Sequence, residues 1–196
     1  MFEVLTVCTG NICRSPLAAE LLRARLAPLE VSVLSAGTRG LSDAPMTSEA
    51  QLLAVQYGVT ADAAASHRSR YLLENHLSSP DLILTMTRDQ RRHVAELAPS
   101  RLRWTFTARE FARLAADVTD DEIRAATESA PDASARVRAA ILVVAARRGM
   151  VMPPANPADD DVIDPYGRSW ETYQLSAAQL VPAVEVVARV LRVAAQ

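Results

Sequence analysis

The stretch that most constrains this chain is VCTGNICRSP at residues 7–16, which lies between a short apolar run and an amphipathic segment. Residues 2–7 are rich in β-branched and aromatic side chains, which predicts a strand. Pro16 suits the first turn of a helix, because its missing N–H costs nothing there. A loop between a strand and a helix N-terminus directs several backbone N–H groups at one point. We call residues 8–15 the cysteine loop and expect it to bind a phosphate-like dianion.

The cysteine loop also carries a candidate nucleophile and a candidate clamp. Cys8 is expected to have a pKa below that of a free thiol, because backbone N–H groups and Arg14 favour its thiolate. The planar fork of Arg14 can hold two phosphate oxygens at once. Ser15 is placed to donate its hydroxyl to the sulfur, and Gly10 and Asn11 tolerate left-handed backbone. The Cys-x5-Arg spacing alone is weak, and a buried structural cysteine beside a solvated arginine is the alternative.

Composition narrows the function classes. The chain has 196 residues, which suits one α/β domain, and its formal net charge is −2. This balance gives no electrostatic case for a nucleic-acid partner. All 21 basic residues are Arg, so chemistry that needs a lysine, such as Schiff-base formation or a P-loop NTPase, is excluded.

The two cysteines both lie in one loop, which argues against a disulfide framework and against a Cys-rich zinc site. We therefore expect neither a metal nor a cofactor. No run approaches the roughly 18 apolar residues of a membrane span, and the first residues lack a basic signal-peptide region. The expected location is the cytoplasm, without a membrane partner.

The remaining pattern alternates strands and helices. We expect strands at residues 2–7, 31–36, 81–86 and 102–106, the last with Trp104 and Phe106 on one face. We expect helices at residues 16–27, 47–56, 71–76, 87–97, 108–116, 132–148 and 170–193, with a capping box at Thr119 and Glu122. The core stripes of the last two helices comprise Val137, Ile141 and Val144, then Leu175, Leu180, Val184, Val187 and Val190. A βαβ unit is right-handed and parallel, which places ligands at the carboxyl ends of its strands, where Cys8 lies.

Several loops carry candidate site residues. Residues 38–45 are expected to form one wall of the pocket, with Leu41 as an apolar contact. His67 is either a surface histidine or a hydrogen-bond partner of the cysteine loop, and the sequence alone does not choose. We interpret His76 and His93 as exposed. Residues 159–161 are three consecutive Asp, which we interpret as a solvated run rather than a magnesium site.

Asp164 is followed by Pro165 and Tyr166, so its direction is fixed by an extended turn. With this motif near the end and the cysteine loop near the start, the chain resembles the low-molecular-weight protein tyrosine phosphatases. The motifs at residues 35–38, 66–70 and 81–86 fall in the family's order. The resemblance covers about residues 1–106 and 162–193.

The resemblance implies an α/β, phosphatase I-like fold: a four-stranded parallel sheet of order 2-1-3-4 with helices on both faces. It also implies catalytic roles for Cys8 as nucleophile, Arg14 as phosphoryl-binding group and Asp164 as general acid. The implied substrate-binding residues are Thr9, Gly10, Asn11, Ile12, Cys13, Leu41 and Tyr166. The implied supporting network comprises Ser15, Ser35 and His67 with Asn11, and Cys13 resembles the family's second loop cysteine, which can trap oxidised Cys8 as a disulfide.

The expected substrate is a phosphotyrosine-containing protein or peptide, with phosphate or other oxyanions as further ligands. Gly167 departs from the family pattern, because some members carry a second aromatic residue there. Residues 117–155 form a helical insertion within an otherwise single domain, open to interpretation as a lid, a homodimer surface or a partner site. Two other functions stay open: an arsenate reductase of the same fold that uses external thiols, and a non-catalytic phosphate- or phosphopeptide-binding module.

Overall fold

A parallel sheet carries the carboxyl ends of its strands to one edge. The computed structural model describes all of residues 1–196. The sheet has the order β2-β1-β3-β4, as predicted. Its strands are β1 (Phe2–Cys8), β2 (Val31–Gly37), β3 (Leu82–Thr85) and β4 (Thr105–Thr107). In the register, Cys8 pairs with Gly37, Val7 with Thr85, and Thr85 with Thr107, so the last residue of each strand lies at the same edge.

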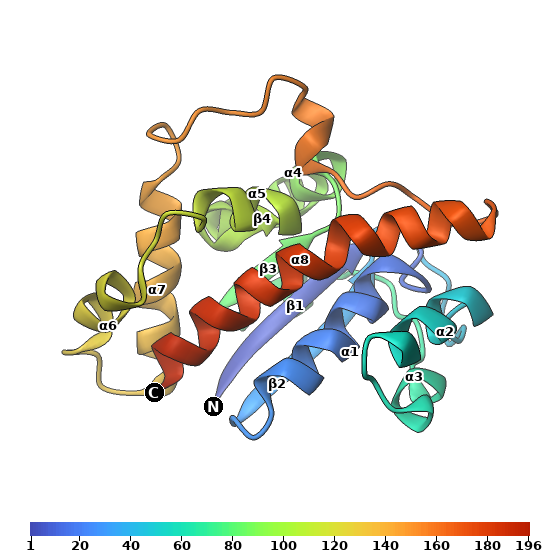
Figure 1. The fold of residues 1–196 in the computed structure, drawn as a ribbon, viewed down its shortest axis with the longest axis horizontal. Coiled ribbons are helices and arrows are strands. Elements are labelled where there is room, and N and C mark those ends of the chain that lie inside the picture. Colours follow the sequence, from blue (N-terminus) through green and yellow to red (C-terminus); the bar gives the residue numbers. More distant parts are fainter.

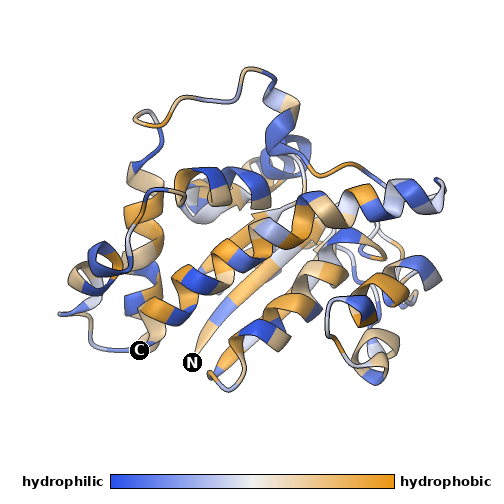
Figure 2. Ribbon diagram, in the orientation of Figure 1, coloured by the Kyte–Doolittle hydropathy of each residue, from blue (hydrophilic) through white to orange (hydrophobic).

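Helices cover both faces of this sheet, as predicted, because the strand side chains alternate between two apolar cores. Val4 and Leu84 belong to a large core shared with α1 (Arg14–Leu26), α5 (Ala108–Leu114) and α8 (Trp170–Ala195). Leu5 and Ile83 belong to a smaller core with Val94 of α4 (Arg88–Leu97). Figure 1 shows α8 and α1 side by side across the near face of β1, and apolar residues follow all three elements in Figure 2.

The loop helices differ from expectation in two places. α2 (Ser48–Gln56) has the predicted bounds, with Thr47 as its N-cap. α3 (Ala61–Ser66) was not predicted; Thr60 caps it by accepting a bond from the N–H of Ala63. The predicted helix at residues 71–76 is instead a 3-10 turn, η1 (Glu74–Leu77), because Leu72 N–H bonds across to Gly37 O and Leu73 is extended.

The fourth strand is shorter than predicted. Residues 99–104 form a 3-10 turn, η2 (Pro99–Trp104), and the Thr105 hydroxyl donates to Arg101 O at 2.9 Å where this turn ends. Trp104 therefore precedes the strand, and the prediction that it shares a strand face with Phe106 was wrong. Phe106 is fully buried and packs edge-to-face on Phe111 of α5.

The region that we predicted as a helical insertion contains α6 (Asp120–Thr127) and α7 (Ala133–Ala146). The predicted capping box of Thr119 and Glu122 is present. The predicted stripe of α7, Val137, Ile141 and Val144, is fully buried in the large core. Arg138 ties this helix to buried Asp81 with a 2.6 Å contact. Figure 1 shows α6 and α7 together beyond one side of the sheet, where α7 packs against α6 and the end of α8.

The predicted burial needs correction at three residues, Leu175, His76 and His93. Leu175 is 49% exposed, because it lies on the outer side of the first turns of α8, whereas Leu180, Val184, Val187 and Val190 are buried as predicted. His76 and His93 are half-buried rather than exposed: His76 Nδ1 accepts the N–H of Leu73, and His93 Nε2 is buried without a partner. No helix combines the length and the apolar character that a membrane crossing requires.

Candidate active site

The cysteine loop curls its donors around the sulfur of Cys8. The backbone N–H of Asn11 donates to Cys8 Sγ at 3.2 Å, and the hydroxyl of Ser15 donates to the same sulfur at 2.9 Å. Asn11 is one of two non-glycine residues with positive φ, at 56°. This left-handed residue turns the chain back, so that its N–H points at the sulfur. Two donors thus converge on one buried sulfur.

The side chain of Asn11 organises a buried network behind the loop. Its Nδ2 donates to the hydroxyls of Ser15 and Ser35, both at 2.9 Å, and its Oδ1 accepts the N–H of Arg70 at 2.9 Å. Ser35 lies near the end of β2 and Arg70 follows α3, so one amide joins three parts of the chain. The Ser15 hydroxyl oxygen accepts a hydrogen bond from Asn11 Nδ2. Its own hydrogen is therefore directed at Cys8 Sγ.

His67 contacts the cysteine loop, which resolves the alternatives that the sequence left open. Its Nε2 lies 2.7 Å from the backbone oxygen of Asn11. A carbonyl only accepts, so the ring nitrogen donates and carries the proton. Burial is the main cause that lowers the pKa of His67 from its ordinary 6.5, and the bond to Asn11 opposes this effect. His67 therefore favours the neutral form in the fold.

Gly37 lets β2 end directly against the cysteine loop. A Cβ at this position would lie 2.6 Å from Thr9 O and 3.1 Å from Asn11 N, both backbone atoms. The next two N–H groups, of Thr38 and Arg39, donate to Cys8 O and Thr9 O at 2.9 Å each. The close approach leaves room only for glycine, and it places residues 38–41 along the mouth of the site.

Gln90, which sequence reasoning missed as a site residue, links the loop to α4. Its Oε1 accepts the N–H groups of Met86 and Thr87 at 2.9 Å each, and its Nε2 donates to Thr9 Oγ1 at 3.1 Å. Because Thr9 Oγ1 accepts this bond, its own hydroxyl hydrogen is free to point elsewhere. The available sequence signal was the Thr87-x-x-Gln90 capping box at the start of α4.

Arg14 and Asp164, 150 positions apart in sequence, are in contact. Arg14 Nη2 lies 2.5 Å from Asp164 Oδ2, and Arg14 Nη1 donates to Val162 O at 3.0 Å. The arginine side chain is 3% exposed and the aspartate side chain 51%. Arg14 Nε is buried without any partner. A buried donor of this kind needs an acceptor, and no group of the protein supplies one.

Two aspartates of the acidic run ahead of Asp164 are anchored, so the interpretation as a solvated run was wrong for Asp160 and Asp161, whereas Asp159 is exposed as expected. Asp160 is only 9% exposed and lies at the end of η3 (Pro157–Asp160). Arg113 of α5 holds its carboxylate with a fork of 3.1 and 2.7 Å contacts, and Thr107 donates to its backbone oxygen at 2.6 Å. Asp161 is held by Arg88 of α4. Arginines from two helices pair with these two carboxylates, which sequence spacing did not reveal.

A cavity of about 370 Å³ opens at these groups. Its lining comprises Cys8, Thr9, Gly10, Ile12, Cys13, Arg14, Arg39, Gly40, Leu41, Asp164 and Tyr166. The predicted site residues Asn11, Ser15, Ser35 and His67 are not in this lining and lie behind the loop. Sequence reasoning missed Arg39 and Gly40, which the predicted wall at residues 38–45 contained. Leu41 and Tyr166 are exposed at the rim, so the deep end is polar and the mouth partly apolar.

Cys13 points to the other side of the loop, toward the C-terminal helix. Its sulfur lies 3.6 Å from Thr47 Oγ1 and 3.6 Å from the hydroxyl of Tyr173. Burial raises the pKa of Cys13, and the two hydroxyl contacts oppose that effect. Burial also raises the pKa of Tyr173 to about 12. Both cysteines are free thiols.

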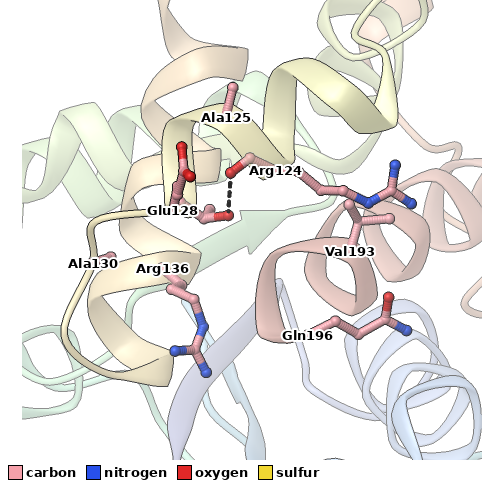
Figure 3. Close-up of a pocket in the computed structure, with 8 residues that line it drawn as sticks. Arg124, Ala125, Glu128, Ala130, Arg136, Val193 and Gln196 are labelled. Carbon is pink, nitrogen blue, oxygen red and sulfur yellow. Dashed lines mark hydrogen bonds between the residues drawn. The ribbon is translucent and has the colours of Figure 1, made fainter.

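A separate cavity of about 670 Å³ lies between α6, α7 and the last turn of α8 (Figure 3). Its lining comprises Arg124, Ala125, Thr127, Glu128, Ala130, Arg136, Val193 and Gln196. It contains no cysteine or histidine and shares no residue with the cavity at Cys8. No group of three or more His, Cys, Asp or Glu side chains in the molecule is arranged to hold a metal ion. Cys8, Arg14 and Asp164 together line the cavity at the cysteine loop.

Comparison with known proteins agrees with this geometry. Residues 3–141 match the family model of the low molecular weight phosphotyrosine protein phosphatases. The match includes the cysteine loop and ends before Asp164. A probable low molecular weight protein-tyrosine-phosphatase, EpsP of Ralstonia solanacearum, is 36% identical over 135 residues, 69% of this chain and 88% of the relative. A protein-arginine-phosphatase of Geobacillus stearothermophilus is 34% identical over 110 residues, 56% of this chain and 71% of the relative.

The fold agrees as well. The crystal structure of a low molecular weight protein tyrosine phosphatase from T. tengcongensis superposes with a TM-score of 0.66 at 25% identity, covering 96% of this chain and 99% of that one. A four-stranded parallel sheet of order 2-1-3-4, a cysteine loop between β1 and α1, and a family match over more than two thirds of the sequence lead to one conclusion: this chain belongs to the low molecular weight phosphotyrosine protein phosphatase family.

Proposed function

We propose that this protein is a phosphotyrosine phosphatase that works through a phosphocysteine intermediate on Cys8. The observation that carries the proposal is the meeting of Cys8, Arg14 and Asp164 in one cavity of about 370 Å³. A sulfur nucleophile, a buried guanidinium and an exposed carboxyl group supply the three functions that transfer of a phosphoryl group to a thiolate requires.

Binding of the phosphoryl group comes first. Arg14 Nη1 is held by Val162 O, which leaves Nε without a partner and Nη2 paired with Asp164. Two equatorial oxygens of the substrate would take these donors, and the backbone N–H groups of the cysteine loop would take the rest. The incoming dianion competes with Asp164 for Arg14. The displaced carboxyl group is then free to carry a proton.

In the first chemical step, Cys8 Sγ attacks phosphorus while the bond from phosphorus to the phenolic oxygen breaks. Protonated Asp164 gives its proton to the departing oxygen, so that a neutral phenol leaves. The Ser15 hydroxyl and the Asn11 N–H stabilise the attacking thiolate. The equatorial oxygens of the phosphoryl group keep their negative charge during this step, and Arg14 and the backbone N–H groups of the loop are already placed to stabilise it.

In the second step, water attacks the phosphocysteine and the sulfur–phosphorus bond breaks. Asp164, now a carboxylate, accepts a proton from that water, and Cys8 leaves as a thiolate. The Ser15 donor that stabilised the nucleophile stabilises the same sulfur as a leaving group. Free phosphate is the second product, and Asp164 is again protonated for the next turnover.

The cavity supports an aryl phosphate as substrate. Ile12, Leu41 and Tyr166 provide apolar surface between the sulfur and the rim, which suits a phenyl ring. A phosphoserine is too short to reach the loop floor while its peptide stays outside. A phosphoarginine would bring a cationic guanidinium into a cavity that holds Arg14 and Arg39, and Asp164 is the sole carboxylate in its lining.

The experiment compares turnover of a phosphotyrosyl peptide, a phosphoseryl peptide and a phosphoarginyl peptide, with p-nitrophenyl phosphate as reference. We expect hydrolysis of the phosphotyrosyl peptide and p-nitrophenyl phosphate, and rapid acid quench with radiolabelled substrate should trap phosphate on Cys8. The Cys8→Ser variant should lose turnover and the trapped intermediate while still binding phosphate. A Cys13→Ser variant, which keeps the nucleophile, is the matched control.

Two other outcomes would redirect the assignment. Preferred turnover of phosphoarginine would move this chain to the activity named for its Geobacillus stearothermophilus relative. Arsenate-dependent oxidation of added glutathione or mycothiol, without phosphate release from p-nitrophenyl phosphate, would favour the arsenate reductase alternative. Phosphate binding without either reaction would favour a binding module.

A further inference from the structure

The segment that carries Asp164 has little regular structure of its own. Residues 161–169 form neither helix nor strand, and Asp164 is half exposed. A general acid must nevertheless meet the leaving-group oxygen with well-defined geometry, since small misplacement lowers the rate strongly. The contacts that fix this segment therefore decide how well the acid works.

The strongest of these contacts converge on Asp161. Its Oδ1 accepts the backbone N–H of Arg88 at 2.8 Å, and the Arg88 side chain donates to both carboxylate oxygens at 3.2, 3.2 and 3.0 Å. Arg88 is the first residue of α4, so the carboxylate lies at a helix N-terminus, where negative charge is favoured. Its hydrogen bonds with Asp161 raise the pKa of Arg88.

The backbone of the same residues is held as well. Arg109 Nη1 donates to Asp161 O at 2.8 Å. The next residue, Val162, donates its N–H to Met86 O at 2.8 Å, directly beyond β3, and its oxygen receives Arg14. The chain then runs two more residues to Asp164. Three residues span at most about 10 Å, so a shift at Asp161 is passed on to the acid.

The first turn of α4 also contacts the nucleophile side of the site. Arg88 holds Asp161, and Gln90, two residues later, donates to Thr9 of the cysteine loop. One rigid helical turn therefore contacts the segment of the acid and the loop of the nucleophile.

From these contacts we propose that Asp161 is a positioning residue for Asp164. Asp161 is held by Arg88 and the N-terminus of α4, and it thereby fixes the position of the Asp164 carboxyl group relative to Cys8. This inference rests on the proposed function, because it needs Asp164 to be the proton donor. It assigns no direct contact between Asp161 and the substrate. The effect of Asp161 is on proton transfer and not on phosphate binding.

The test uses the dependence of kcat/KM on the leaving group. Phenolate needs a proton to leave, whereas p-nitrophenolate leaves more readily without one. We expect Asp161→Ala and Arg88→Ala to lower kcat/KM about 10-fold for phenyl phosphate and about 2-fold for p-nitrophenyl phosphate, a partial loss of the ~100-fold worth of acid catalysis. The inhibition constant of inorganic phosphate should change less than about 2-fold, because the substitutions do not touch ground-state binding of the phosphoryl group.

Matched controls separate positioning from folding. Asp159→Ala removes an exposed neighbour of the same charge, and Arg124→Ala breaks an exposed arginine–aspartate ion pair on α6; both should leave the two kcat/KM values unchanged. Thermal unfolding of each variant checks that the fold is intact. Should Asp161→Ala fail to fold, Asp161→Asn, which keeps acceptors for the Arg88 N–H, and Arg88→Lys provide the same comparison with smaller effects.

An equal loss on both substrates, or no loss on either, would overturn the positioning role of Asp161. The Asp164→Asn variant distinguishes this from failure of the proposed function. If Asp164→Asn loses activity on phenyl phosphate while Asp161→Ala does not, only the positioning role is wrong. If Asp164→Asn keeps full activity, the acid assignment fails and the role of Asp161 falls with it.

Discussion

The cysteine loop and the segment that carries Asp164 meet at one cavity but are built in opposite ways. The loop is short in sequence and buried, and the contacts to Cys8 Sγ come from Asn11 and Ser15 within eight residues. The segment of Asp164 is largely exposed and depends on partners far away in sequence, such as Arg88 and Arg113. A local site of the first kind can be recognised from a motif, whereas the second needs the whole fold.

The difference also predicts how substitutions in each region affect stability and activity. Damage to the loop should affect stability and activity together, because its polar groups are buried and must be hydrogen-bonded. Damage to the exposed segment should affect activity with little loss of stability, because exposed ion pairs contribute little to folding. The following predictions test this contrast.

The largest expected effect is a loss of activity caused by a substitution in the exposed segment of Asp164. Asp164→Asn removes the proton donor and should lower kcat/KM for phenyl phosphate at least ~100-fold, the usual worth of acid catalysis. The free energy of unfolding should stay nearly constant, because the side chain at this position is half exposed and the Asn amide oxygen can still accept a hydrogen bond from Arg14. Steady-state kinetics and urea unfolding measure the two effects. A large loss of stability would show that the segment of Asp164 contributes to folding, which would contradict the difference between the two regions.

The next largest effect is a loss of both stability and activity caused by a substitution in the buried cysteine loop. Asn11→Ala removes the side chain that makes three hydrogen bonds and leaves the Ser15 and Ser35 hydroxyls without their donor. We expect a loss of about 2–3 kcal/mol in the free energy of unfolding, at roughly 1 kcal/mol for each hydrogen bond, with about a 10-fold fall in kcat/KM. Asn75→Ala, at an exposed asparagine without side-chain contacts, is the control. Unchanged stability would contradict a structural role for the network.

A smaller effect should come from Gln90→Glu. The carboxylate can still accept the N–H groups of Met86 and Thr87, so the cap of α4 is kept. It cannot donate to Thr9, whose hydroxyl must then turn toward it and away from the cavity. We expect about a 5-fold fall in kcat/KM, the equivalent of one hydrogen bond, with a minor change in thermal stability. Gln51→Glu in α2 is a control outside the site, and an unaltered kcat/KM would remove Gln90 from the support of the loop.

The smallest effect concerns pH. Because burial lowers the pKa of His67 below 6.5, the folded state binds fewer protons than the unfolded state as the pH falls below that value. The contribution of neutral His67 to stability is therefore complete above pH 6.5 and is lost as the pH falls toward its folded pKa. His67→Gln keeps a donor for Asn11 O but does not titrate. Urea unfolding at pH 7.5, 6.5 and 5.5 should show a weaker decline for this variant, and identical declines would contradict the prediction.

Local sequence pattern predicted most of the strands and the residues that surround the sulfur, whereas the order of the sheet was implied by the resemblance to the family. Strand and helix periodicity, the Gly-Asn pair and the Ser-Pro that opens α1 all act over a few residues. The errors occurred where tertiary contacts override local pattern. Trp104 leaves the expected strand for a 3-10 turn, and Leu175 faces outward on a helix that is otherwise buried along its core stripe.

The sequence by itself determined that a loop with Cys8, Arg14 and Ser15 joins the first strand to a helix, and it predicted anion binding and a nucleophilic cysteine there, because every group that builds this loop lies within one short stretch. Only the tertiary structure decided which groups Asp160 and Asp161 contact. Their partners come from α4 and α5, more than 40 residues earlier, and a charge in sequence does not reveal its counter-charge in space. Long-range pairing of this kind depends on how the helices pack on the sheet, which no local pattern encodes.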